Sequence, residues 1–315
     1  MWHTELPLYH NLSYIAGIRL NMLYLGHEYR RSDSMATDTL RLSIVQMQVG
    51  LDKNQNLDRA ALMVGEAAGQ GAQMVVLPEI FNSPYIARRF PEYAESYPGA
   101  TTNLLSELAR QHRLILVGGS IPERDDNGAL FNTSFVFGPD GTLIGLHRKI
   151  HLFDVDIPGK MTFQESVTLS PGNELQIMDR GDLRFAVMIC YDVRFPELAR
   201  QAALQGVHLL LIPAAFSRTT GSLHWDILMR CRAVDNQVFV AAAAPAYNPQ
   251  ASYQTWGHSM VVDPWGKVLA QAGDQEELLL VDLDLSIIDE VRDQIPVLKQ
   301  RRTDLYQLVS KLGSK

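Results

Sequence analysis

The stretch AVMICYDVRFPEL, residues 186–198, sets the expectation for both the fold and the chemistry. The apolar residues 186–189 predict a buried strand, and Pro196 suits the first turn of a helix. Cys190 comes at the end of that strand. A strand-to-helix turn lifts a side chain out of a packed sheet and leaves backbone N–H groups free to bind an anion. Cys190 is therefore placed as a nucleophile, and the alternative is a small buried core residue.

The elements around this stretch occur twice along the chain in the same order, with prolines and glycines at matching places. Chance similarity among buried strands is the alternative, but the shared order favours a true repeat. The matched segments are LSIVQMQV (42–49) with FAVMICY (185–191), GAQMVVLPE (71–79) with GVHLLLIPA (206–214), LILVGGS (114–120) with VFVAAAA (238–244), and the hairpins 135–144 and 260–269. Two such halves, packed sheet to sheet with helices outside, predict an α/β fold built as a four-layer αββα sandwich.

The halves are not separated by a linker, so we expect a single domain over 41–307, preceded by an N-terminal extension (1–40) and followed by a tail (308–315). Residues 1–34 show no sustained period and no convincing secretory signal, and one hypothesis makes Met35 the physiological start. Segment 151–175 contains Pro158, Gly159 and Pro171 and no long period. It is expected to be an extended loop, which at that length is more often functional than idle.

The composition limits the classes of partner. A net charge of −7 argues against a nucleic-acid or anionic-membrane surface, and no apolar run approaches the roughly 20 residues that span a bilayer. Two cysteines make no disulfide framework and favour a reducing, cytoplasmic location. The chain has no CxxC or HExxH spacing, so no metal site is expected.

Three polar positions follow strand ends, where α/β sheets place their ligand sites: Glu79, Lys149 and Cys190. Singly, Glu79 could be a solvated strand-end residue, and Lys149 could belong to the basic run 147–149. Together they make a plausible acyl-transfer set. A thiol with a pKa of about 8.5 needs a base or a nearby cation, and Glu79 could take its proton and return it to a leaving amine. Lys149 and the N–H of Tyr191 could hold the oxyanion of a tetrahedral intermediate.

From about residue 41 to 307 the chain resembles the nitrilase superfamily. The matching blocks are VVLPEIFNSPY (75–85), HRKIHLFDVDIPGKMTFQES (147–166) and ICYDVRFPELA (189–199). The resemblance implies a Glu-Lys-Cys triad, with Glu79 as general base, Lys149 as oxyanion stabiliser and proton donor, and Cys190 as nucleophile. It places the second glutamate of the superfamily, which orients the lysine and the substrate, at Glu165.

Four further blocks resemble the omega-amidase branch: AFSRTTGSLHW (215–225), CRAVDNQVFVA (231–241), WGHSMVVDPWGKVLA (256–270) and IPVLKQRRTDLY (295–306). This implies hydrolysis of the terminal amide of 2-oxoglutaramate or 2-oxosuccinamate to the oxo-diacid and ammonia, without a metal or cofactor, by a homodimer. The alternatives within the superfamily are a deaminated-glutathione amidase and an N-carbamoyl amidohydrolase. A binding protein that has kept the fold is the alternative from another class.

Such a substrate needs a partner for its distal carboxylate. Arg194, four residues past the cysteine, is the main candidate because its planar guanidinium suits a carboxylate, although a structural ion pair at a helix start would also explain it. Tyr85 and Thr220 are weaker candidates from loops expected to face the same pocket, and Tyr191 would contribute its backbone N–H.

The other cysteine and two histidines are expected to play no catalytic part. Cys231 is expected in the core, in a helix with Ile227 and Val234 on the same face. His151 and His258 invite a Cys–His interpretation, but the Glu–Lys set already supplies the base.

Overall fold

The computed structural model describes residues 39–309. The hypothesis about Met35 lies outside the described residues. Within the described range, no helix is long and apolar enough to cross a membrane.

The first sheet is built around three short parallel strands. In it, β1 pairs in parallel with β2, β2 pairs in parallel with β3, and β5 then runs antiparallel to β3. The order across the sheet is β15-β1-β2-β3-β5-β4, and β6 also pairs with β5. The strands are β1 (Thr39–Gln46), β2 (Met74–Val76), β3 (Ile115–Val117), β4 (Ile121–Arg124), β5 (Leu130–Phe137), β6 (Leu143–Arg148) and β15 (Glu277–Asp284).

The second sheet repeats this pattern with different residues. Here β10, β11 and β12 run parallel, and β13 then runs antiparallel to β12. Its order is β14-β13-β12-β11-β10-β9. The strands are β9 (Ile177–Arg180), β10 (Leu183–Val187), β11 (Leu209–Pro213), β12 (Phe239–Ala243), β13 (Met260–Val262) and β14 (Val268–Gln271). The shared order of three parallel strands and one antiparallel strand matches the repeat seen in the sequence.

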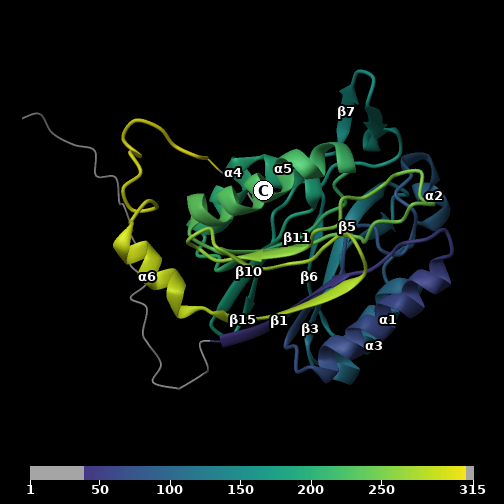
Figure 1. Cartoon of the computed structure of the whole chain (residues 1–315), viewed down its shortest axis with the longest axis horizontal. Helices are drawn as coiled ribbons and strands as arrows, with labels where there is room; N and C mark the ends of the chain where they lie inside the picture. Colours follow the sequence, from purple (N-terminus) through teal and green to yellow (C-terminus); the bar gives the residue numbers. More distant parts are fainter. Residues whose placement is uncertain (1–38, 310–315) are drawn as a thin grey trace, which may run out of the picture. The chain divides into compact units, whose positions relative to one another are not determined.

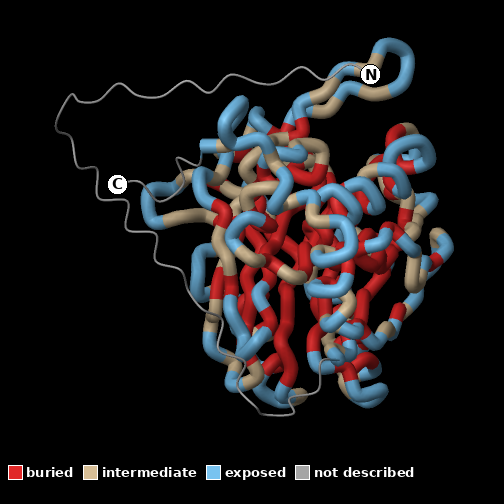
Figure 2. The backbone as a smooth tube through the Cα atoms, turned by 90° about the vertical axis from the view of Figure 1, so that its left-hand side faces the viewer, coloured by how far each residue is buried: buried red, intermediate tan, exposed pale blue. Residues whose placement is uncertain are grey.

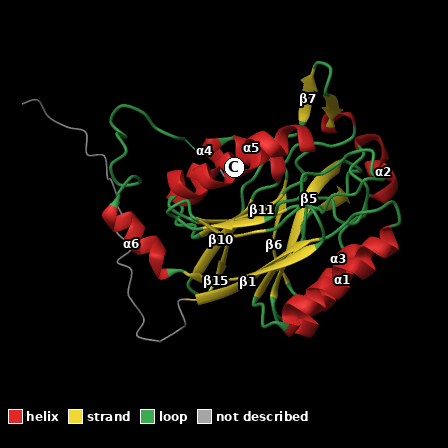
Figure 3. Cartoon of the chain, viewed as in Figure 1, coloured by secondary structure: helices red, strands yellow, loops and turns green. Residues whose placement is uncertain are grey.

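Four helices cover the outer faces of the two sheets (Figure 1; Figure 3). Along β1, Leu42 and Ile44 point into the core between the sheets, whereas Val45 points outward to a core formed with helices α1 and α3. On the other side, α4 and α5 pack against the second sheet. These helices are α1 (Lys53–Gly69), α3 (Ala100–His112), α4 (Pro196–Leu204) and α5 (Arg218–Asn236). The α/β fold with four layers is confirmed, and Figure 2 shows the buried segments gathered at its centre.

The short elements include one that the sequence did not predict. Segment 151–175, expected to be a loop, contains a hairpin of β7 and β8 that projects from the rest of the fold (Figure 1). Each of the two strands has only four residues, and none of these residues is fully buried. The hairpin therefore shows neither an apolar run nor a sustained alternation of apolar and polar residues in the sequence. The remaining elements are β7 (Asp154–Ile157), β8 (Met161–Gln164), α2 (Phe90–Tyr93), α6 (Ser286–Gln294) and the 3-10 turns η1 (Ala87–Arg89), η2 (Glu165–Val167) and η3 (Cys190–Arg194).

The expectation that Cys231 lies in the core is wrong. Its side chain is exposed, and Ile227 and Val234 on the same helix are 60% and 47% exposed. The buried face of α5 instead contains Trp225 and Met229. Since α5 has apolar residues on two faces, their spacing alone does not show which face meets the sheet.

Candidate active site

Four of the predicted catalytic residues meet in one fully buried cluster. The Nζ atom of Lys149 lies 3.0 Å from Oε1 of Glu79 and 2.9 Å from Oε1 of Glu165, and all three side chains are inaccessible to solvent. Cys190 is buried beside this cluster, because the charges of Glu79 and Lys149 both act on the pKa of its thiol, in opposite directions. These residues are far apart in the sequence, and the ends of β2, β6 and β10 bring three of them together.

Glu79 is positioned by the way the chain leaves β2. The N–H of Leu77 still donates to the carbonyl of Val117, so the strand pairing continues to within two residues of the glutamate. The backbone beside it is crowded, because a Cβ atom on Gly119 would lie 2.1 Å from the carbonyl oxygen of Pro78. Gly119 also has a φ of +53°, which only glycine adopts at low cost. This glycine therefore permits the close approach that fixes the start of the Glu79 turn.

Cys190 lies on a strained turn. Strand β10 ends at Val187, and Cys190 is the first residue of η3 with a φ of +47°, a left-handed conformation that costs a non-glycine residue roughly 1–2 kcal/mol. Such strain is common where a reactive side chain must be held out of a sheet. In the part of the chain that the structure describes, the N–H of the next residue, Tyr191, donates to no acceptor. That N–H is therefore available to an oxyanion beside the thiol.

The carboxylate of Glu79 accepts hydrogen bonds from four donors. Three reach Oε1: Nζ of Lys149, Nδ2 of Asn132 at 2.9 Å and the hydroxyl of Tyr85 at 3.3 Å. Oε2 accepts from the backbone N–H of Ala215 at 2.7 Å. Asn132 was not predicted from the sequence, although an asparagine within the apolar strand FNTSFVF is a visible signal. It could not have found Ala215, which acts through its backbone and follows Ala214, the counterpart of Glu79 in the repeat.

Burial and neighbouring charge set the protonation states of this cluster. Burial raises the pKa of Glu79, the charge of Lys149 lowers it, and repulsion from Glu165 helps to leave it above the usual range. Burial also raises the pKa of the Cys190 thiol well above its usual value, with the charge of Glu79 adding to the rise. Burial lowers the pKa of Lys149, but Glu165 and Glu79 outweigh that and raise it well above the usual value. The resting site therefore holds a protonated thiol beside an ammonium group.

Glu165 completes the surroundings of the lysine. It begins η2, directly after β8, and its Oε2 accepts from the backbone N–H of Phe153 at 2.7 Å. Its Oε1 accepts from Lys149 and from the hydroxyl of Tyr85, the latter at 2.7 Å. The projecting hairpin thus has both of its ends tied to one carboxylate.

A second buried carboxylate lies close by. Asp192 accepts from the ring nitrogens of His147 at 2.9 Å and His151 at 2.8 Å, and from the backbone N–H groups of Ile189 and His151. Burial alone would raise the pKa of Asp192, but the hydrogen bonds from the two histidines hold it well below its usual range. Asp192 therefore ties the Cys190 turn to the segment that carries Lys149. The ring of His151 contacts Asp192 and stacks on Phe195, with ring centroids 3.6 Å apart.

The predicted substrate-binding residues lie in different surroundings. The guanidinium of Arg194 is 4.9 Å from the ring centroid of Phe216 and 5.7 Å from that of Tyr191, and its Nη1 lies 3.2 Å from Nδ1 of His224. Between residues 39 and 309, no carboxylate forms an ion pair with Arg194. Thr220 is buried in the first turn of α5, where its hydroxyl shares a hydrogen bond with that of Ser217.

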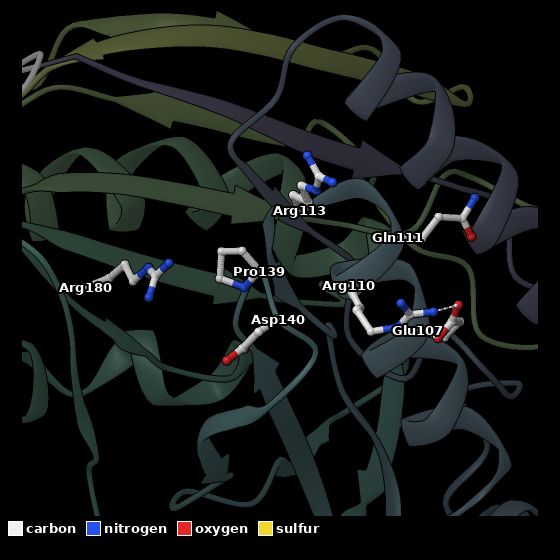
Figure 4. A pocket seen from close by; sticks show the side chains of 7 residues that line it. All are labelled: Glu107, Arg110, Gln111, Arg113, Pro139, Asp140 and Arg180. Atoms are coloured by element: carbon white, nitrogen blue, oxygen red, sulfur yellow. Dashed lines mark hydrogen bonds and ion pairs between the residues drawn. The ribbon is translucent and has the colours of Figure 1, made fainter.

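A surface hollow lies apart from this cluster, and Figure 4 shows its seven lining side chains. None of the candidate catalytic residues is among them. They are Glu107, Arg110, Gln111, Arg113, Pro139, Asp140 and Arg180. Arg110 is already paired with Glu107 at 2.6 Å. Among the described residues, no group of three or more histidines, cysteines, aspartates and glutamates is arranged to hold a metal ion.

The cluster contains the parts needed for acyl transfer. A buried thiol beside a carboxylate can lose its proton as it attacks, since the carboxylate can take that proton. An ammonium group and a free backbone N–H beside the thiol can stabilise the resulting oxyanion.

Comparison with known proteins agrees with this chemistry. Residues 41–293 match the family model described as carbon-nitrogen hydrolase. Mouse omega-amidase NIT2 is 56% identical over 273 residues, covering 87% of this chain and 99% of that protein, and human omega-amidase NIT2 is 54% identical over the same length. The crystal structure of Saccharomyces cerevisiae Nit3, a member of branch 10 of the nitrilase superfamily, aligns with a TM-score of 0.78 at 44% identity, covering 84% of this chain and 97% of that one. The chain therefore belongs to the carbon-nitrogen hydrolase family.

Proposed function

We propose that the protein is an omega-amidase that hydrolyses the terminal amide of 2-oxoglutaramate or 2-oxosuccinamate. The observation that carries the proposal is the buried cluster of Glu79, Lys149 and Cys190, in a chain more than half identical to the mouse and human omega-amidases. The cluster supports amide hydrolysis, and the relatives support the substrate class.

In the first half-reaction, the sulfur of Cys190 attacks the amide carbon while its proton passes to Glu79. The carbonyl oxygen becomes an oxyanion, which Lys149 and the N–H of Tyr191 stabilise. When the C–N bond breaks, the leaving nitrogen takes the proton from Glu79 and departs as ammonia, and a thioester remains on Cys190. The raised pKa of Glu79 suits it to hold that proton between the two steps.

In the second half-reaction, Glu79 takes a proton from a water molecule that attacks the thioester carbon. A second oxyanion forms on the same donors, the C–S bond breaks, and the proton on Glu79 returns to the sulfur. The products are the 2-oxo dicarboxylate and the free thiol, so one water is consumed and one ammonia released per cycle.

We assign the distal carboxylate of the substrate to Arg194. Its guanidinium lies beside two aromatic rings, one of which belongs to the residue next to the nucleophile, and it has no carboxylate partner between residues 39 and 309. A planar guanidinium can bind a carboxylate through two parallel hydrogen bonds, which the ammonium group of a lysine cannot reproduce. Thr220 and Tyr191 are the further candidates for substrate contact.

The decisive experiment is a substrate panel. Ammonia release would be measured with 2-oxoglutaramate, 2-oxosuccinamate, a neutral primary amide and an N-carbamoyl compound, and release of the dipeptide amine with deaminated glutathione, whose hydrolysis yields no ammonia; Cys190→Ala is the inactive control. We expect the first two to have the highest kcat/KM; a preference for one of the last two would overturn the assignment. Arg194→Lys should raise KM for 2-oxoglutaramate far more than for the neutral amide, and equal effects on both would refute its role.

We also propose a homodimer that packs through the outward face of α5. Leu223, Ile227 and Val234 lie exposed along this helix, and such an apolar stripe favours a partner surface. Light scattering after size exclusion tests this. Ile227→Glu should give monomers, whereas Leu62→Glu, which changes a 53% exposed leucine on α1, should leave the dimer intact. A dimer that survives Ile227→Glu would refute this interface.

The same mechanism supports a reducing location such as the cytoplasm, because the nucleophile must remain a free thiol. Both cysteines are free here, Cys190 buried and Cys231 exposed.

A further inference from the structure

The hydroxyl of Tyr85 lies against both carboxylates that flank Lys149. It is 2.7 Å from Oε1 of Glu165 and 3.3 Å from Oε1 of Glu79, and its oxygen lies 3.5 Å from Nζ of Lys149. All of these groups are buried. The sequence suggested a substrate-binding role for this residue, but its one hydroxyl proton is directed at the carboxylates.

Aromatic packing fixes where this hydroxyl lies. The ring of Tyr85 stacks with that of Phe163 at 5.3 Å, lies 4.7 Å from that of Tyr253 and meets the ring of Phe90 edge-on at 5.8 Å. Phe163 comes from β8, two residues before Glu165. The ring would therefore stay in place if only its hydroxyl were removed.

A donor is needed here because the cluster has one cation for two carboxylates. Lys149 is nearly equidistant from the two, so its charge is divided between them. A hydrogen bond to an ionised carboxylate stabilises the charged form and lowers the pH at which it takes up a proton. Burial and the nearby carboxylates raise the pKa of Tyr85 well above its usual value, so its hydroxyl keeps its proton and stays a donor.

We propose that Tyr85 is a positioning residue whose hydroxyl, held against both carboxylates that flank Lys149, keeps Glu79 available as the base for Cys190, and that it does not bind the substrate. Without its hydroxyl, the cluster takes up a proton at higher pH, and Cys190 then has no base. This inference extends the proposed function to one further residue, but it requires only that Glu79 be the base for Cys190.

The test uses Tyr85→Phe, with Tyr253→Phe as the matched control. The control removes a hydroxyl from the same aromatic group, but one that donates to the backbone carbonyl of Ala215 at 2.8 Å. In a Cys231→Ser background, Cys190 is the only thiol of the chain. Its alkylation by iodoacetamide is followed between pH 4.5 and 8, which requires no knowledge of the substrate.

We expect the acid limb of Cys190 alkylation to move to higher pH by about one unit in Tyr85→Phe, as the loss of a hydrogen bond to a charged group implies, and to stay in place in Tyr253→Phe. On whichever amide the wild type hydrolyses, Tyr85→Phe should lower kcat with little change in KM. A uniform loss of rate at every pH, equal shifts in both variants, or a rise in KM alone would overturn the proposal. A substrate panel without 2-oxoglutaramate activity would refute the omega-amidase assignment and leave the alkylation result standing.

Discussion

The protein contains two buried carboxylates that look alike and behave in opposite ways. Glu79 and Asp192 are both fully buried, and each accepts four hydrogen bonds. Yet the pKa of Glu79 is raised, whereas that of Asp192 is held well below its usual range. Equal burial and equal numbers of donors therefore do not decide which carboxylate can carry a proton.

The neighbouring groups make the difference between the two pKa values. Glu79 shares its one cation with Glu165, and the repulsion between the two carboxylates opposes the ionised state. Asp192 has two histidines as partners and shares them with no other carboxylate in the described chain. A proton can thus move to and from Glu79, while Asp192 stays ionised and holds the Cys190 turn. One segment, the end of β6 and the residues after it, supplies both sites. His147 and His151 contact Asp192, and Lys149 between them contacts Glu79.

Lys149→Met should have the largest effect on stability and activity, because it leaves two buried carboxylates, Glu79 and Glu165, without a cation. Breaking a buried ion pair in this way costs about 3–5 kcal/mol of unfolding free energy. The folded-state pKa of Glu79, already raised, should rise further above its unfolded value, so the loss of stability should grow as the pH rises from the unfolded toward the folded pKa. Thermal unfolding between pH 5 and 8 measures this, and amide hydrolysis should fall below detection.

A second substitution serves as the control for Lys149→Met. Adding Glu165→Gln removes one of the two unpaired charges and should recover part of the stability at pH 8. If the double variant were no more stable than the single one, repulsion between the carboxylates would not contribute to the raised pKa of Glu79.

Asp192→Asn tests whether the second buried carboxylate only holds the Cys190 turn in place. The amide keeps the shape but cannot accept all four hydrogen bonds, so buried donors lose a partner at a cost of about 1–3 kcal/mol. The Cys190 turn should loosen, and kcat/KM should fall roughly 10- to 100-fold, as misplacement of a reacting group implies. The acid limb of the pH profile should not move, because Asp192 carries no proton in the reaction. A shift of that limb would mean that the two carboxylates act as one unit.

The sequence predicted the two halves and three of the four clustered residues for a physical reason. Glu79, Lys149 and Cys190 each follow an apolar or hairpin strand, and strand ends in packed sheets converge on one edge. Glu165 came from the resemblance alone, since the short hairpin before it shows no period. The hydrogen bond from Ala215 to Glu79 could not be predicted from the sequence, because it comes from a backbone N–H, which every residue except proline has. The wrong placement of Cys231 arose because α5 is apolar on both faces, so only the packed structure shows which face is buried.

The smallest effect is expected for His151→Gln, which separates the support of Asp192 from catalysis. The side chain of His151 is 28% exposed, and glutamine can still donate to Asp192, while His147 keeps its own bond to the carboxylate. We expect kcat/KM to fall less than about tenfold, because glutamine can keep a hydrogen bond to Asp192 and only the stacking on Phe195 is lost. Removing a general base would instead cost about 10²- to 10⁴-fold. Initial rates across pH 5–8, with His112→Gln as the control, distinguish the two. A loss of 10²- to 10⁴-fold, together with a shift in the acid limb of the pH–rate profile, would make His151 the base for Cys190. Glu79 would then not be the carboxylate that carries the proton.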